Sequence, residues 1–489
     1  MSRMSFLKVT KVVTAVGVGV AGLVVGVAGS ASSASPPPPT VHLVAVLHQT
    51  NVDRYAGQNQ LFISPGVYVA SLGGPFEIDA YGNADGSVTL WQVKRNGTSV
   101  TKIREITAPS PVTLGDGLPD FVQLTLASAK GKTISQQLQP FCPGGSYSEA
   151  RVNRTGPDRP TYPSVCGTQL TQAMPWGIDN GWGMGIFAGM RFPTYLADGT
   201  YQLTVAINPA YASQLNVPAA EASATVTLAV TTVQDCNPEI VCQTPAARLA
   251  AARAAQRPVP LGAQASAAPL SGVPDLRALP AHDLSTEHNK DDGHDYLDFG
   301  ATIWNGGSGP LDLEGFREGD SQTMQAVQYI YTDGQPDAGQ VVGEFEFDTR
   351  PGHDHWHMED IAQYDLLDSA GRRVVLSEKQ SFCLAPTDPI NLLTRGADWG
   401  AEVEPLSSAC QGEDAIWLRE VLPAGWGDTY YQSVAGQSFD ITDLANGSYR
   451  VRITTDPNHT LVETSYANNV GLLTVTLGGT RGHRTVTVG

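Results

Sequence analysis

The stretch Leu196-Ala197-Asp198-Gly199-Thr200-Tyr201 leads into alternating apolar residues that end at Asn208-Pro209. A second stretch, Leu444-Ala445-Asn446-Gly447-Ser448-Tyr449, leads into a similar alternation that ends at Asp456-Pro457. An Asp-Gly or Asn-Gly pair before alternating apolar residues is typical of a tight turn that enters a β-strand. The pattern predicts a chain of short strands in which one unit occurs twice.

Further segments match in the same order, and Cys166 and Cys410 precede the matching tryptophans by equal distances along the chain. The matched segments are Gln139-Pro140-Phe141-Cys142 with Gln380-Ser381-Phe382-Cys383, and Gly181-Trp182-Gly183 with Gly425-Trp426-Gly427. Several matches in one order favour an internal duplication. The alternative is that β-sandwiches share such turn patterns without common origin.

The composition agrees with a mostly β fold. Only 16% of the 489 residues are charged, and the chain has 51 glycines and 33 prolines, which favours short strands joined by turns. We expect two β-sandwich-like domains. The formal net charge of -18 repels phosphate backbones and attracts cations, so we expect a cationic partner and no nucleic acid.

The N-terminus has the features of a secretory signal peptide. Basic residues precede an apolar run over 12–27 and a small-residue stretch over 28–35. A membrane anchor is the alternative, but the run is shorter than the roughly 20 residues that span a bilayer. We expect a secreted protein without membrane association after cleavage. The expected divisions are a signal peptide over 1–35, a β domain over 40–234, an Ala-, Arg- and Pro-rich linker over 235–270, a second β domain over 271–480 and a tail over 481–489.

Six cysteines, an even count in an exported chain, favour disulfides, although sequence alone permits fifteen pairings. The similarity between the two halves predicts the pairs Cys142 with Cys166 and Cys383 with Cys410. Cys236 and Cys242 would then close a small loop.

Three histidines alternate in Pro351-Gly352-His353-Asp354-His355-Trp356-His357. On a strand, residues i, i+2 and i+4 line one face, so three imidazoles there can converge on one cation. Imidazole suits copper, zinc, iron and nickel. The alternatives are an exposed polar strand edge or a purification tag, but a tag would stand at a terminus and run unbroken.

The first half lacks these histidines. When the halves are aligned through Asp120 and Asp360, Thr113-Leu114-Gly115-Asp116-Gly117 stands in the place of the histidine cluster. We therefore predict that the first domain is a degenerate, non-catalytic copy without the metal site.

Several motifs follow the histidines along the chain. They are Tyr364-Asp365-Leu366-Leu367-Asp368, Glu378-Lys379-Gln380-Ser381-Phe382-Cys383-Leu384, Asp428-Thr429-Tyr430, Asp440-Ile441-Thr442-Asp443 and Tyr466-Ala467-Asn468-Asn469-Val470. In this order they resemble the catalytic domain of the lysyl oxidase family, and the chain is identified as a bacterial-type secreted member. The likeness covers roughly Pro274 to Leu477. The stretch from Asp388 to Trp399 departs from it as an insertion.

The resemblance implies a function and site residues. His353, His355 and His357 would bind copper, and Lys379 and Tyr430 would become cross-linked into a lysine tyrosylquinone cofactor. The enzyme would oxidise primary amines, either lysyl side chains of proteins or small amines, to aldehydes with O2. In the first half, Leu138 and Ile186 stand opposite Lys379 and Tyr430, so the cofactor precursors are missing together with the ligands.

Several alternatives stay open. Asp360 and Asp428 are candidate catalytic bases, or they form turn and strand-end hydrogen bonds. The histidines could also serve a zinc or iron enzyme, or a non-catalytic copper-binding or adhesion protein of the cell exterior. The acidic residues between Asp283 and Asp298 could bind calcium, or form a solvated loop; they are Glu287, Asp291, Asp292 and Asp295.

Overall fold

The computed structural model describes residues 38–489 except 56–60, 145–148, 158, 187, 191–195, 234–270, 319–320, 349–354, 378–380, 382, 400–407, 409 and 435. The expected signal peptide over 1–35, the linker over 235–270, Cys236 and Cys242 lie outside the described residues. Pro39–Gly489 forms one compact unit.

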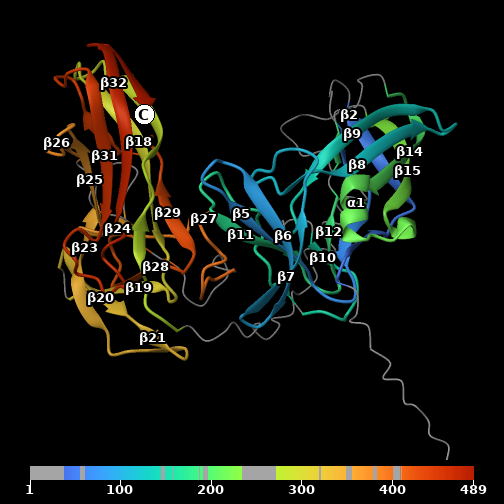
Figure 1. Cartoon of the computed structure of the whole chain (residues 1–489), viewed down its shortest axis with the longest axis horizontal. Helices are drawn as coiled ribbons and strands as arrows, with labels where there is room; N and C mark the ends of the chain where they lie inside the picture. Colours follow the sequence, from blue (N-terminus) through green and yellow to red (C-terminus); the bar gives the residue numbers. More distant parts are fainter. Residues whose placement is uncertain are drawn as a thin grey trace, which may run out of the picture. The chain divides into compact units, whose positions relative to one another are not determined.

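The mostly β fold is confirmed, because the regular secondary structure of the described residues is strand apart from two short helices. These are α1 (Pro209–Leu215) and the 3-10 helix η2 (Ala219–Glu221). The side chain of Asn208 caps α1 by accepting the N–H of Ala210, and Pro209 occupies its first turn. Figure 1 shows α1 beside β8, where the Tyr211 hydroxyl donates to the Pro119 carbonyl.

The described strands up to residue 233 form four sheets. Their orders and bounds are β1 (Val41–Ala45), β4 (Val67–Ser71), β12 (Trp182–Gly185) and β10 (Glu149–Arg151); β11 (Ala173–Ile178), β5 (Phe76–Gly82), β6 (Val88–Asn96) and β7 (Ser99–Ile106); β13 (Ala188–Met190) and β3 (Leu61–Ile63); and β2 (Gln49–Tyr55), β15 (Ser223–Val233), β14 (Gly199–Ile207), β8 (Leu118–Ser128) and β9 (Thr133–Phe141).

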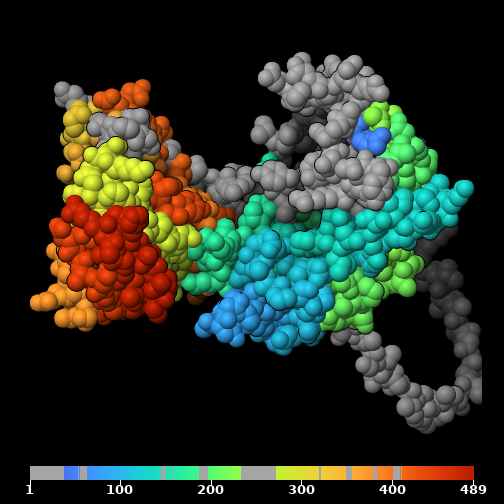
Figure 2. Space-filling view, turned by 90° about the horizontal axis from the view of Figure 1, so that it is seen from above, coloured from blue at the N-terminus to red at the C-terminus, as the bar shows by residue number. Residues whose placement is uncertain are grey.

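From residue 276 onward, the strands that the structure describes also form four sheets. They are β16 (Leu276–Ala278), β18 (Asp295–Asn305), β29 (Trp426–Tyr430) and β27 (Asp388–Pro389), with β17 (His282–His288) and β30 (Ser438–Asp440) paired to β18; β24 (His355–Met358), β23 (Gln340–Asp348), β20 (Thr323–Tyr329), β19 (Leu311–Phe316) and β28 (Trp417–Leu422); β21 (Tyr331–Thr332) and β22 (Gln335–Pro336); and β26 (Arg373–Leu376), β25 (Ala362–Leu367), β31 (Gly447–Thr455), β32 (Val470–Thr480) and β33 (His483–Val488). In the space-filling view, the last strands form a continuous red patch (Figure 2).

The two halves share local geometry at the matched positions. The order β9-β8-β14-β15 in one sheet parallels β26-β25-β31-β32 in another. Gly199 and Gly447, which begin β14 and β31, have φ of 152° and 154°, a region that favours glycine. Asp120 and Asp360 also both have positive φ, at 54° and 56°. These features support the duplication, while the domain boundaries stay predictions.

The expected disulfides are formed between Cys142 and Cys166 and between Cys383 and Cys410. The Cα atoms lie 5.7 Å apart in the first pair and 5.9 Å apart in the second, and both distances are ordinary for a disulfide.

The insertion expected between Asp388 and Trp399 packs against the strand that carries Tyr430. It contributes β27, whose Asp388 pairs with Gly427 of β29. The Trp426 indole donates to the Asp398 carbonyl at 2.6 Å. The insertion therefore supports β29 along one edge.

Candidate functional site

Strand β24 carries two of the three predicted histidines and presents them on one face. His355 is half-buried and His357 is 1% exposed. Trp356, between them, points to the opposite face, where it is fully buried against Phe347 and donates to the Gly412 carbonyl. The alternation of a strand thus separates a polar face from a core face, as the sequence predicted. His353 lies outside the described residues.

The two imidazoles face each other through their Nε2 atoms, which lie 2.9 Å apart. Two nitrogen ligands at right angles, each about 2.0–2.1 Å from an ion, lie about 2.9 Å from one another. Without an ion, this contact requires one ring N–H to donate to the other ring. The pair therefore fits two adjacent positions around a metal such as copper.

The other ring nitrogen of His357 is held by polar groups. Its Nδ1 lies 3.3 Å from Asp348 Oδ2 and 3.3 Å from Ser381 Oγ. A carboxylate on the far nitrogen fixes the ring orientation and directs the Nε2 lone pair toward a metal. Asp348 belongs to β23, where it pairs in register with His355.

Tyr430 lies at the end of β29 with its ring turned inward. Its hydroxyl donates to the Cys383 carbonyl at 3.2 Å and lies 3.2 Å from the Cys383 N–H. Burial, followed by the charges of Asp428 and Glu420, raises the pKa of Tyr430 well above its usual value.

One short segment contacts both predicted halves of the site. Ser381 contacts His357, and two residues later Cys383 contacts Tyr430. Two residues span at most about 7 Å of chain. The structure therefore brings His355, His357 and Tyr430 to one region. Lys379, which begins this segment, lies outside the described residues.

The two candidate bases occupy different environments. Asp428 is 2% exposed and stands two residues before Tyr430, on the same face of β29. Asp360 is exposed, has positive φ and accepts from the Asn458 side chain at 3.2 Å. Asp428 is thus close to the half-buried Tyr430, whereas Asp360 has the geometry of a turn residue.

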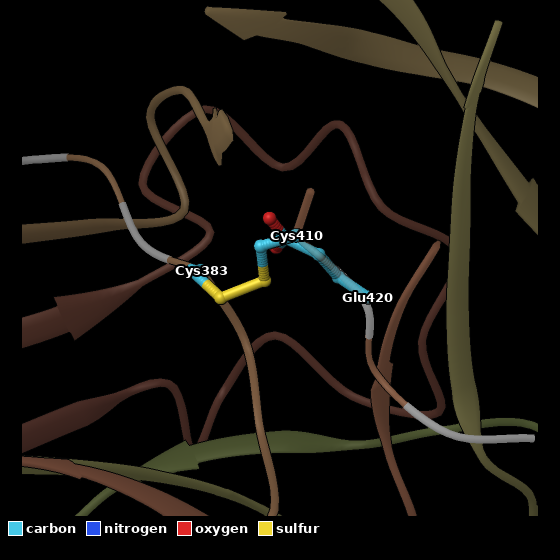
Figure 3. Close-up of side chains that lie close together, drawn as sticks. All are labelled: Cys383, Cys410 and Glu420. Carbon is cyan, nitrogen blue, oxygen red and sulfur yellow. A yellow bond between two sulfur atoms is a disulfide. The ribbon is translucent and has the colours of Figure 1, made fainter. Parts of the chain in front are cut away.

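Glu420 is fully buried next to the disulfide (Figure 3). Among the described residues, one group of metal-ligating types has its ligand atoms within 4.8 Å of one another: Cys383, Cys410 and Glu420. The two cysteines are bonded to each other, so they offer no thiolates and this group is not a metal site.

The corresponding place in the first half has different chemistry. Residues 113–116 help to line a pocket of about 560 Å³ with other polar and apolar side chains, and the Thr113 hydroxyl donates to Asp116 at 2.6 Å. Ile186, opposite Tyr430, is buried, and Leu138, opposite Lys379, is 49% exposed. None of these residues is a histidine, and the side chains of Ile186 and Leu138 offer no ligand atom.

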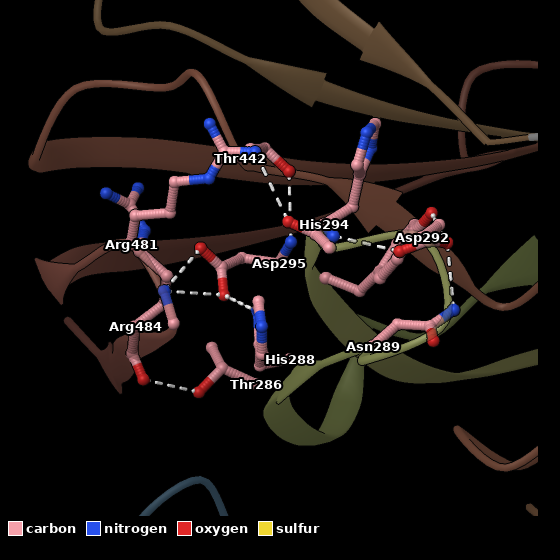
Figure 4. Close-up of polar contacts among 12 residues, drawn as sticks. Thr286, His288, Asn289, Asp292, His294, Asp295, Thr442, Arg481 and Arg484 are labelled. Atoms are coloured by element: carbon pink, nitrogen blue, oxygen red, sulfur yellow. Dashed lines mark hydrogen bonds and ion pairs between the residues drawn. The ribbon is translucent and has the colours of Figure 1, made fainter.

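The acidic loop expected as an alternative calcium site is occupied by hydrogen-bond donors (Figure 4). Asp292 accepts from Asn289, from the His294 N–H and from the Tyr296 hydroxyl. Asp295 accepts from the Gly482 N–H, and His288 lies 2.9 Å away. The Gly482 hydrogen bond is the leading cause that lowers the pKa of Asp295. This geometry favours a hydrogen-bonded loop.

Sequence reasoning missed Asp348 and Glu420 as site residues. The sequence holds a signal for Glu420, because this acid stands between Leu418 and Leu422 at alternate positions of one strand. In the structure all three side chains are fully buried. A lone acid on an apolar strand face indicates a buried carboxyl. Asp348 carries no such signal, since its role depends on how β23 pairs with β24.

Part of the chain is similar in sequence to known proteins. Residues 320–486 match the sequence model of the family described as lysyl oxidase. Lysyl oxidase homolog 2B of Danio rerio is 32% identical over 142 residues, which are 29% of this chain and 17% of the relative. Protein-lysine 6-oxidase of Sus scrofa is 33% identical over 120 residues, which are 24% of this chain and 42% of the relative. The human protein-lysine 6-oxidase is 32% identical over 120 residues, 24% of this chain and 25% of the relative.

The chain thus covers less than half of the length of these relatives. The similarity to lysyl oxidases lies in the second half of the chain. A bacterial type is not supported by these comparisons. No helix among the described residues is long and apolar enough to cross a membrane.

Proposed function

We propose that the chain is a secreted, copper-dependent amine oxidase whose cofactor is a lysine tyrosylquinone made from Lys379 and Tyr430. The observation that carries the proposal is the segment that contacts His357 through Ser381 and Tyr430 through Cys383. Lys379 stands two residues before Ser381, so covalent geometry keeps their Cα atoms within about 7 Å. Secretion rests on the signal-peptide pattern and agrees with the disulfides.

The chain's own residues have distinct roles in this proposal. His353, His355 and His357 hold copper, while Asp348 and Ser381 orient the ring of His357. Copper and the quinone, when present, supply two-electron redox chemistry with O2. Asp428 is the base that takes a proton from the carbon next to the amine nitrogen, because it is buried on the same face as Tyr430.

The reaction balances without another reductant. A primary amine, O2 and water give an aldehyde, ammonia and hydrogen peroxide, and two electrons pass from the amine carbon to O2. Cofactor formation joins the Lys379 nitrogen to the Tyr430 ring. This step consumes two O2. One oxygen atom enters the cofactor, and the other three leave with the four hydrogen atoms that the two side chains lose, as one water and one hydrogen peroxide.

The substrate class follows from charge. The formal net charge of -18 concentrates cationic amines near the protein. We propose peptidyl-lysine or a small primary amine as substrate, and a non-catalytic role for the first half.

The test is peroxide release by the copper-loaded protein with a panel of amines. Lys379→Ala and Tyr430→Phe should abolish release, while Tyr431→Phe is a matched control, because this neighbouring tyrosine is 49% exposed. If the wild-type protein reacts and either of the first two variants reacts equally well, the quinone assignment is wrong. Copper content after each histidine substitution tests ligation separately.

A further inference from the structure

Glu420 is a fully buried acid with few hydrogen bonds. It lies on β28, paired in register with Leu313 of β19, and it is 0% exposed. Its Oε2 accepts the Leu384 N–H at 3.0 Å. Among the described residues, its Oε1 has no hydrogen-bond partner within ordinary geometry. Burying a carboxyl with so few partners is costly, and an apolar residue of similar size would avoid that cost.

The surroundings of Glu420 join two parts of the candidate site. The backbone of Met358, the residue after His357, interacts favourably with the charged carboxylate. Leu384 follows Cys383, whose N–H and carbonyl both contact the Tyr430 hydroxyl. One side chain thus lies between the histidine strand and the segment that leads back to Lys379.

The disulfide reinforces this arrangement. Its sulfur atoms lie within 4.8 Å of a Glu420 oxygen, and the Cys410 carbonyl accepts the backbone N–H of Trp356, between the two histidines. Burial raises the pKa of Glu420 well above its usual value. The hydrogen bond from the Leu384 N–H gives the buried carboxyl a specific backbone partner.

We propose that Glu420 is a positioning residue for cofactor formation, which holds the Cys383–Leu384 backbone so that it keeps its contact with Tyr430. The inference rests on the proposed function, because it concerns how the quinone precursors meet. Glu420 acts through the Leu384 N–H and touches neither substrate nor metal in this role.

The experiment compares Glu420→Gln, Glu420→Ala and Glu420→Met in the full chain. After copper loading in air, it measures copper per chain, the visible absorbance of the quinone after phenylhydrazine trapping, and the cross-linked Lys379–Tyr430 peptide by mass spectrometry. Glutamine keeps an oxygen that can accept from Leu384, whereas alanine and methionine do not. Glu463→Ala is the matched control, since Glu463 Oε2 accepts the Leu276 N–H at 2.7 Å in the same way at another place.

We expect Glu420→Gln to form the quinone at nearly the wild-type rate per bound copper. Glu420→Ala should form the quinone about tenfold more slowly, because loss of a hydrogen bond to a buried group typically has an effect of this size. If the alanine variant does not fold, the methionine variant, which fills the same volume, takes its place. The inference is overturned if the acceptor-free variant forms quinone as fast as wild type, or if glutamine is as defective as alanine. Absence of quinone in the wild-type protein would instead refute the proposed function.

Discussion

Asp348→Asn should weaken copper binding about tenfold without removing a ligand. The carboxylate lies 3.3 Å from His357 Nδ1 and is 9% exposed, so water competes little for it. Outer partners of metal-bound histidines are typically worth about 10–100-fold in affinity. Because 3.3 Å exceeds the usual range of an N–H···O bond, we expect the lower end, which corresponds to about 1.4 kcal/mol.

The assay is a competition titration of Cu²⁺ against a chromophoric chelator. Ser381→Ala should cost less than Asp348→Asn, because the hydroxyl is neutral and shares the same nitrogen. Asp368→Asn is the control, since Asp368 pairs with Arg372 in a turn and should leave the affinity unchanged. The reasoning fails if Asp348→Asn binds copper as tightly as wild type while His357→Ala does not bind it.

Three other changes have defined outcomes. Tyr430→Phe should retain copper and lose the phenylhydrazine adduct; an adduct at wild-type yield would contradict its role. Trp356→Ala should lower the free energy of unfolding by about 3–5 kcal/mol, because it empties a fully buried site; denaturant titration measures this, and a loss below about 1 kcal/mol would show that the indole packs poorly. Burial raises the pKa of Asp312 to about 6, so the folded protein holds a proton that the unfolded chain releases, and stability falls as pH rises from about 4 to 6. Asp312→Asn should remove this fall, so its stability relative to wild type should increase between these pH values; a constant difference would refute the sign.

The sequence predicted the strand-based fold and the face that carries His355 and His357, because these depend on local alternation. It also predicted both described disulfides, since each position has a counterpart in the other half. It did not predict α1, although Asn208 and Pro209 form a helix-start signal. The alternating pattern predicts only that a strand ends at these residues, and a seven-residue helix leaves little periodicity to detect.

The groups around the histidines were harder to predict. Asp348 precedes His357 in the chain and Ser381 follows it, and both side chains contact its ring. No local sequence pattern predicts either contact. Their contacts depend on pairing between strands and on the path of a loop. Long-range packing, which single-sequence periodicity does not encode, decides these positions.

The position of Trp356 has a consequence for how β24 can pair. Among the described strands, β24 pairs with β23 alone and forms the edge of its sheet. A slip of one residue in register would exchange its faces, so that the imidazoles would enter the core and the indole would leave it. Expelling an indole costs several kcal/mol, and placing two imidazoles among apolar side chains would add to that. The buried indole therefore opposes the register slip that would turn His355 and His357 to the core face of β24.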